Sequence, residues 1–450
     1  MNLVEKYNVP VPRYTSYPTV PAWKNNLSNA IWKEKVKEAF KVSNAKDGIS
    51  IYIHLPFCES LCTYCACNTR ITVNHKVEEP YIDTLLKEWS LYLKLFDGKP
   101  RIKELHLGGG TPTFFNPVNL SKLIKGILKE SEVCENAEFS FEAHPSNTLP
   151  GHLIALYNLG FKRISFGIQD FDLKVQEAIN RYQTFEEVCV IVNQARNVGY
   201  TSVNFDLVYG LPFQTLESIT DTIKKVFQLK PDRIAFYSYA HVPWVKPGQR
   251  KFTEKDLPSG NTKRQLYELG RESFLEKGYV EIGMDHFALK SDDLYKAAEN
   301  KTLHRNFMGY TPDYTKLLVG LGVSSISDTG DAFAQNIKTV EEYQACINKH
   351  SFAITKGHVL SNDEVFLRSI ILDIMCHLET SWNEKAVAHK GFADGLKRLE
   401  SFEEDGLVEI YPYHLKITDK GKAFLRNICS CFDVYYELNL KKEKTFSNAV

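Results

Sequence analysis

From about residue 48 onward, short apolar runs alternate with longer stretches in which apolar residues recur at helical spacing. Each run is rich in Ile, Val, Phe or Tyr and ends in Gly, Pro or a polar residue, which is typical of strands. The runs cover residues 49–56, 102–110, 138–145, 163–170, 202–212 and 233–243. Amphipathic helices are predicted between them, at residues 78–96, 119–131 and 215–230. This alternation predicts parallel strands joined by right-handed helical crossovers.

Six strand–helix units in succession indicate an α/β fold, either a doubly wound sheet or a complete or partial (β/α) barrel. In both architectures, ligands bind beyond the carboxyl ends of the strands. That rule selects candidate site residues by their position alone. They are Tyr52, His54, residues 108–111, Glu142, Gln169, Asp206, Ala240 and His241.

The same pattern divides the chain into three parts. We expect an N-terminal arm over residues 1–47 and the strand–helix domain with its C-terminal extension over residues 48–355. Within that extension, 278–289 predicts one more strand leading into a polar loop, and 304–327 is rich in turns with no long helix. Residues 356–450 are mostly helical with two short strands, which is typical of a small winged-helix-like domain.

Charge and composition exclude several classes of function. The 55 basic and 55 acidic residues cancel, so the chain lacks the basic excess of a nucleic-acid-binding surface. The N-terminus resembles neither a signal peptide nor a transit peptide, and no apolar segment approaches the ~18 residues of a membrane span. We therefore expect a cytoplasmic protein, by default a monomer, whose thiols stay reduced.

Four cysteines lie within ten positions, at Cys58, Cys62, Cys65 and Cys67. A structural zinc site usually takes two separated ligand pairs, and no second pair lies nearby. A redox C-x-x-C is present at 62–65, but it leaves Cys58 unexplained. An iron–sulfur cluster held by one short loop is the third interpretation, and we favour it. Three thiolates on a four-iron cluster leave one iron open to a substrate or cofactor.

The spacing C-x3-C-x2-C after the first strand of a strand–helix series resembles the radical S-adenosylmethionine (SAM) superfamily. The resemblance implies that Cys58, Cys62 and Cys65 hold a 4Fe–4S cluster and that Cys67 lies outside the ligand set. It also implies that SAM chelates the open iron and is cleaved by one electron to a 5′-deoxyadenosyl radical. Tyr64 matches the aromatic residue that contacts adenine in this superfamily.

Motifs along nearly the whole chain narrow the resemblance. They are KYNVPVPRYTSYPT, YIHLPFCESLCTYCACN, LHLGGGTPT, ISFGIQDF, VNFDLVYGLPFQT, GMDHFA, LHRNFMGYT, GLGVSSIS and RNICSCFD. In this order they resemble the oxygen-independent coproporphyrinogen III oxidase family. That family decarboxylates the ring A and B propionates of coproporphyrinogen III to vinyl groups, giving protoporphyrinogen IX in haem biosynthesis. The alternatives are a haem-chaperone-type relative, a haem-degrading relative and a porphyrin-binding delivery protein.

Matching the motifs residue by residue implies two SAM molecules beside the cluster, with an unidentified electron donor and acceptor. The first SAM would contact Tyr52, Tyr64, Gly109, Glu142 and Ile326, and the second Gly110, Thr111, Gln169, Arg181, Asp206 and Ala240.

Some of these assignments also have a physical reason. Glycines leave the backbone bare for a close ligand, and Glu142 and Asp206 would be costly at apolar strand ends without a partner. Arg181 suits a carboxylate, although on a surface helix an arginine is more often solvated.

The implied substrate carries four carboxylates, so we expect cationic and hydrogen-bonding groups around it. The candidates are His286, His304, Arg305 and Tyr14, and the two histidines are equally compatible with a packed or capping role. His144 stands where related sequences often carry an acidic or amide residue, so no role is assigned to it.

Overall fold

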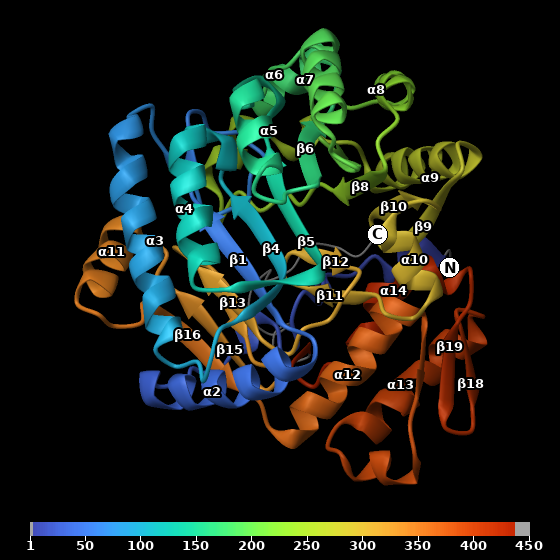
Figure 1. The fold of residues 1–450 in the computed structure, drawn as a ribbon. Coiled ribbons are helices and arrows are strands. Elements are labelled where there is room, and N and C mark those ends of the chain that lie inside the picture. The colour runs from blue at the N-terminus through green and yellow to red at the C-terminus, as the bar shows by residue number, and fades with distance from the viewer. Residues whose placement is uncertain (1–2, 437–450) are drawn as a thin grey trace.

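The computed structural model describes residues 3–436 and is built around one twelve-stranded sheet (Figure 1). The strand order is β16-β15-β14-β13-β1-β4-β5-β6-β7-β8-β10-β9, so the sheet has two edges and forms a partial rather than a closed (β/α) barrel. Its middle consists of the six predicted parallel strands, which are confirmed as β1 (Ile49–Leu55), β4 (Arg101–Gly109), β5 (Glu132–Ala143), β6 (Arg163–Gln169), β7 (Ser202–Tyr209) and β8 (Arg233–Ser238).

Helices cover the outer face of these strands (Figure 1). They are α3 (Glu78–Leu93), α4 (Pro117–Lys129), α5 (Pro150–Tyr157), α7 (Phe185–Val198), α8 (Leu216–Leu229) and α9 (Gly260–Glu276), whereas the short helix α6 (Leu173–Ile179) packs in a separate apolar cluster with Val208 and Leu211. Local chemistry sets their ends. The Asn116 side chain accepts hydrogen bonds from two backbone N–H groups of the first turn of α4, and Gly199, with φ of 118°, ends α7 in the left-handed conformation.

Shorter strands extend the sheet at both edges. Beyond β1 lie β13 (Leu318–Leu321), which is parallel to it, and then the antiparallel strands β14 (Ile326–Asp328), β15 (Ala332–Asn336) and β16 (Ile354–Val359). Beyond β8 lies a hairpin of β9 (Tyr279–Gly283) and β10 (His286–Leu289). The strand predicted within 278–289 is present as β9, but the predicted polar loop was wrong, because a two-residue turn at Met284 and Asp285 leads into a second strand, β10, that pairs with β8.

A separate hairpin and a small domain complete the described chain. The hairpin β11 (His304–Asn306) and β12 (Gly309–Thr311) stands apart from the main sheet. The small domain contains α12 (Asn362–His377), α13 (Phe392–Glu404), α14 (Leu425–Ser430) and a three-stranded sheet of β17 (Glu379–Ser381), β19 (His414–Ile417) and β18 (Val408–Tyr411). Helices with a small antiparallel sheet agree with the winged-helix-like expectation for this part of the chain.

Two apolar cores hold the structure together. The main core lies between the sheet and its helices and includes Trp32 and Phe40 of α2 (Asn29–Lys46). The second core joins α12, α13 and α14 to Tyr7, Tyr14 and Tyr17 of the N-terminal residues. The predicted division into three domains remains a prediction, and β16 crosses its boundary at 355/356. Among residues 3–436, no helix combines the length and apolarity that a membrane crossing requires.

Candidate functional site

The cysteine loop follows β1 directly, at the carboxyl edge of the partial barrel. Cys58 ends the short strand β2 (Phe57–Cys58), and Cys62 and Cys65 lie in the turns that follow. These three thiols are half-buried, Cys67 is exposed, and all four are free. Burial raises the pKa of the Cys58 thiol to about 11, whereas a hydrogen bond with Cys67 lowers the pKa of Cys65 to about 6.

Arg181 is buried beneath this loop and is not solvated as an arginine on a surface helix would be. Helix α6 ends at Asn180 in the left-handed conformation (φ 53°), which turns the chain inward at Arg181. The guanidinium donates to the Gly167 carbonyl (2.5 Å) and to the Cys62 sulfur (3.7 Å), and its Nε has no partner. Burial raises the pKa of Cys62, and Arg181 opposes that effect by favouring the thiolate, which is the form that binds metal.

The glycine turn at the end of β4 is closely packed by the chain itself. A Cβ at Gly109, whose φ is 116°, would lie 2.7 Å from the His54 ring, and one at Gly110 would lie 2.6 Å from the Pro56 carbonyl. Thr111 Oγ1 lies 3.3 Å from Cys58 Sγ, so this turn contacts the cysteine loop. Glycine is therefore required here by the fold, and the close approach of a ligand to this backbone remains a prediction.

Glu142 at the end of β5 faces the same turn. Its carboxylate accepts a hydrogen bond from the Gly109 N–H (3.2 Å), and His106 Nε2 lies 3.7 Å away. Desolvation acts to raise the pKa of Glu142, but the His106 and Gly109 interactions outweigh it, and the pKa falls below its usual value. Tyr52 on β1 completes this group, with its hydroxyl 3.0 Å from His54 Nδ1.

Asp206 on β7 is a second carboxylate with the opposite electrostatics. It accepts hydrogen bonds from Ser165 (2.9 Å) and Asn204 (2.9 Å). Desolvation, reinforced by the negative charge of Glu142, raises the pKa of Asp206 to about 6. Both carboxylates line one polar cavity of about 600 Å³ inside the partial barrel. Two acidic groups in one cavity thus have separated pKa values, a common arrangement in active sites.

The structure links Tyr64 and Ala240 through Gln249, a residue that the sequence analysis missed. Gln249 is fully buried, and its amide donates to the Tyr64 carbonyl and to the Ala240 carbonyl, each at 3.2 Å. Its oxygen accepts from the Val242 N–H at 2.6 Å. No local signal marks Gln249, because it lies on a short 3-10 helix (Pro247–Lys251) and its partner in the cysteine loop, Tyr64, is 185 residues away along the chain.

Two further predicted contacts lie close to these groups. Gln169, at the end of β6, is buried and adopts a positive φ of 66°. The backbone carbonyl of Ile326 on β14 lies against Gly320 of β13. Gly320 is in turn the residue of β13 that pairs with Tyr52 of β1. The side chain of Ile326 packs against an apolar cluster that includes Trp23.

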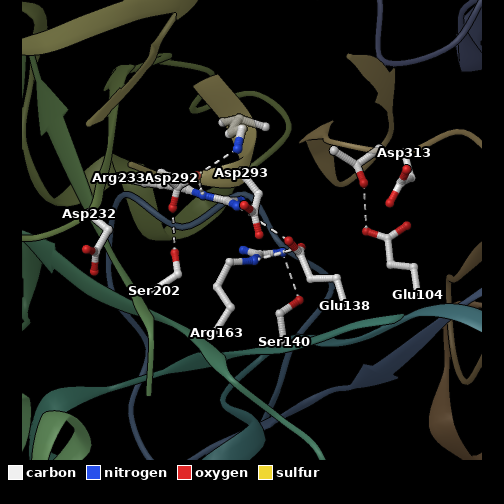
Figure 2. A network of polar contacts seen from close by, with 12 residues as sticks. Glu104, Glu138, Ser140, Arg163, Ser202, Asp232, Arg233, Asp292, Asp293 and Asp313 are labelled. Carbon is white, nitrogen blue, oxygen red and sulfur yellow. Dashed lines mark hydrogen bonds and ion pairs between the residues drawn. The ribbon is translucent and has the colours of Figure 1, made fainter. Parts of the chain in front are cut away.

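A network of paired charges supplies Arg163 and Arg233 to the lining of the cavity (Figure 2). Arg163 donates to Glu138 (2.8 Å), and Arg233 binds Asp292 (2.6 Å) while also lying 3.4 Å from Glu138. Ser140 accepts a hydrogen bond from Arg163 at 2.8 Å. The two arginines of this network are thus each paired with a carboxylate of the chain.

The hairpin of β11 and β12, together with β10, forms one wall of the cavity through His286, Asn306 and residues 308–311. Two of the predicted substrate contacts are engaged elsewhere. The His304 ring packs on Tyr314 with centroids 4.6 Å apart, and the Tyr14 hydroxyl donates to Asp433. His144 caps a short helical turn by accepting from the Ser146 N–H, and it too is not part of the cavity lining.

The cysteine loop has the chemistry that an iron–sulfur cluster requires. Within residues 3–436, no three His, Cys, Asp or Glu side chains converge as they would on a single metal ion. A cluster needs less convergence, because each thiolate binds a separate iron. Here Cys58, Cys62 and Cys65 share one short loop, and Arg181, with an unpartnered Nε, lies against them. The donor set and its cationic neighbour therefore fit a thiolate-bound cluster and an anionic ligand beside it.

Comparisons with known proteins agree with this arrangement. Residues 52–226 match the Radical SAM superfamily. The chain is 38% identical over its full length to the oxygen-independent coproporphyrinogen III oxidase of Synechocystis sp., covering 97% of that protein. The Helicobacter pylori (strain 26695) protein of the same name is 39% identical, over 96% of this chain and 95% of that protein.

A solved structure extends the agreement to three dimensions. The coproporphyrinogen III oxidase of Escherichia coli, described as a radical SAM enzyme, is 36% identical and superposes with a TM-score of 0.89. The superposition covers 94% of this chain and 97% of that one, which includes the barrel and the small C-terminal domain. The chain therefore belongs to the oxygen-independent coproporphyrinogen III oxidase family of the radical SAM superfamily.

Proposed function

We propose that this protein catalyses the oxygen-independent oxidative decarboxylation of coproporphyrinogen III to protoporphyrinogen IX. The propionates on rings A and B lose CO2 and become vinyl groups, a step of haem biosynthesis. One observation carries the proposal: a three-cysteine loop, a glycine turn and two carboxylates meet at the carboxyl edge of one partial barrel, beside a polar cavity.

We assign the 4Fe–4S cluster to Cys58, Cys62 and Cys65. One SAM would contact the group around Tyr52, Tyr64, Gly109, Glu142 and Ile326. We propose a second SAM near Gly110, Thr111, Gln169, Arg181, Asp206 and Ala240. When bound, the cluster and SAM supply the electron and the carbon radical that removes a hydrogen atom from the substrate.

The protein's own groups bind and orient these partners. Glu142 is anionic at neutral pH because its pKa is lowered, so it can accept hydrogen bonds from an ammonium or ribose hydroxyl group. Arg181 favours the Cys62 thiolate, and its unpartnered Nε is available to a carboxylate. For each propionate, an external donor would supply the one electron that SAM cleavage requires. When the substrate loses CO2, one electron would pass to an external acceptor.

The test is an anaerobic assay of the iron-reconstituted protein with SAM, a reductant and coproporphyrinogen III. We expect protoporphyrin, detected after oxidation by chromatography, together with 5′-deoxyadenosine. A protein that binds porphyrin or haem but forms no protoporphyrin would instead be a chaperone-type or delivery protein, and cleavage of the haem ring would indicate the degrading relative.

Replacing Cys62 with Ser tests the cluster assignment. We expect this variant to lose the brown colour, the cluster iron and SAM cleavage together, because a hydroxyl is a poor ligand for iron. Cys189→Ser on α7, outside the cysteine loop, is the matched control and should retain all three. SAM cleavage by Cys62→Ser at the wild-type rate would overturn the assignment.

A further inference from the structure

Arg305 is a buried cation to which residues 3–436 supply no counter-ion. Only 4% of its surface is exposed, and its Nε and Nη1 have no hydrogen-bond partner. It forms no ion pair with any acidic side chain in residues 3–436. A buried charge that lacks a partner costs several kcal/mol, so a protein rarely retains one unless a ligand compensates it.

The position of Arg305 connects it to the polar cavity through Tyr310. It lies on β11 directly opposite Tyr310 of β12, so both side chains are on the same face of the hairpin. The guanidinium carbon lies 4.5 Å from the centre of the Tyr310 ring, and Tyr310 lines the cavity. His286 also lines the cavity, with its ring 5.3 Å from that of Tyr310 and its Nδ1 buried without a partner.

The groups around Arg305 do not neutralise its charge. Asp285 lies next to His286 in sequence, but its carboxylate is bound to Arg13 at 3.1 Å. The Cys376 and Cys429 thiols are within electrostatic range of Arg305. Burial raises the pKa of Cys376 to about 12 and the pKa of Cys429 well above its usual value, so both thiols are neutral. By contrast, Arg163 and Arg233, the two arginines that line the cavity, are paired with carboxylates.

We propose that Arg305, assisted by His286, binds one propionate carboxylate of the substrate. This inference rests on the proposed function, since it names a contact within the same site. A guanidinium fork matches a carboxylate in shape and charge. His286 presents a neutral ring, because burial lowers its pKa to about 4, and can donate one further N–H. Tyr310 holds the guanidinium in place by stacking on it.

The test compares Arg305→Met and Arg305→Lys with wild-type protein in the anaerobic assay. Arg305→Met should raise the KM for coproporphyrinogen III about 10- to 100-fold, as expected when a hydrogen-bonded charge is lost. The KM for SAM should stay unchanged, and Arg305→Lys should recover part of the affinity. A rise in the KM for SAM instead would assign the carboxylate of SAM to Arg305 and overturn the proposal.

Stability supplies a second readout with a matched control. Arg368 is also buried and stacks on an aromatic ring, Phe333 at 4.7 Å, but it is paired with Asp328. In ligand-free protein, Arg305→Met should raise the Tm because it removes an uncompensated charge, whereas Arg368→Met should lower it by leaving Asp328 unpaired.

The outcomes separate this inference from the proposed function. If wild-type protein forms no protoporphyrin, the proposed function fails, whatever the variants do. If wild type is active and Arg305→Met shows an unchanged KM for coproporphyrinogen III, the proposal for Arg305 is wrong. Binding of coproporphyrin III, followed by fluorescence, gives the same comparison without turnover. The free acid should bind wild type more tightly than Arg305→Met. Its tetramethyl ester, which has no carboxylates, should bind the two proteins with equal affinity.

Discussion

Replacing Gln249 with Ala tests whether one buried side chain holds the cysteine loop against the barrel. The substitution removes three hydrogen bonds, to the Val242 N–H and to the Tyr64 and Ala240 carbonyls. At about 0.5–1.5 kcal/mol each, the lost bonds sum to roughly 1.5–4.5 kcal/mol. The partners are left buried, and the cavity adds to the cost.

The assay is urea unfolding of the apoprotein, in which the midpoint should fall markedly for Gln249→Ala. Gln265→Ala, an exposed glutamine on α9, is the control and should change stability by less than about 0.5 kcal/mol. The KM for SAM should also rise in Gln249→Ala, because Tyr64 and Ala240 both lie at the proposed SAM sites. An unfolding midpoint and a KM that both match wild type would refute the reasoning.

Two other substitutions probe the strand ends. Gly109→Ala should destabilise the protein by about 1–3 kcal/mol and weaken SAM binding, because the φ of Gly109 is 116° and the new methyl group would lie 2.7 Å from the His54 ring. Thermal melting would measure the loss of stability, and SAM titration would measure the loss of binding. A melting curve identical to that of wild type would count against the packing argument. Asp206 has a pKa of about 6 in the folded state, above the ~3.9 of an unfolded Asp, so the contribution of Asp206 to wild-type stability should fall as pH rises from about 4 to about 6. Asp206→Asn should lack that fall, and parallel pH profiles for the two proteins would show that the shift is absent.

Much of the fold follows from local pattern. The six central strands and the helices α3, α4 and α8 lie where the apolar periodicity predicts them, because burial on one face of a helix or both faces of a strand requires that spacing. The β9–β10 hairpin was missed because no strong turn signal separates its strands, and only pairing with β8 decides its path. The site residues at strand ends were predicted by the rule that ligands bind beyond the carboxyl ends of parallel strands. Applying that rule requires only the order of strands and helices along the chain.

The sequence by itself determined the parallel strand–helix order and the cysteine spacing, since both depend on neighbours along the chain. Only the tertiary structure decided that Arg181 is buried against Cys62, that Gln249 joins the cysteine loop to the end of β8, and that no acidic side chain in the described part of the chain pairs with Arg305. The first two facts depend on contacts between segments about 100 residues apart or more. The third depends on which side chains surround Arg305 in the folded protein. Desolvation and pairing are properties of that three-dimensional surrounding, and a linear pattern carries no record of them.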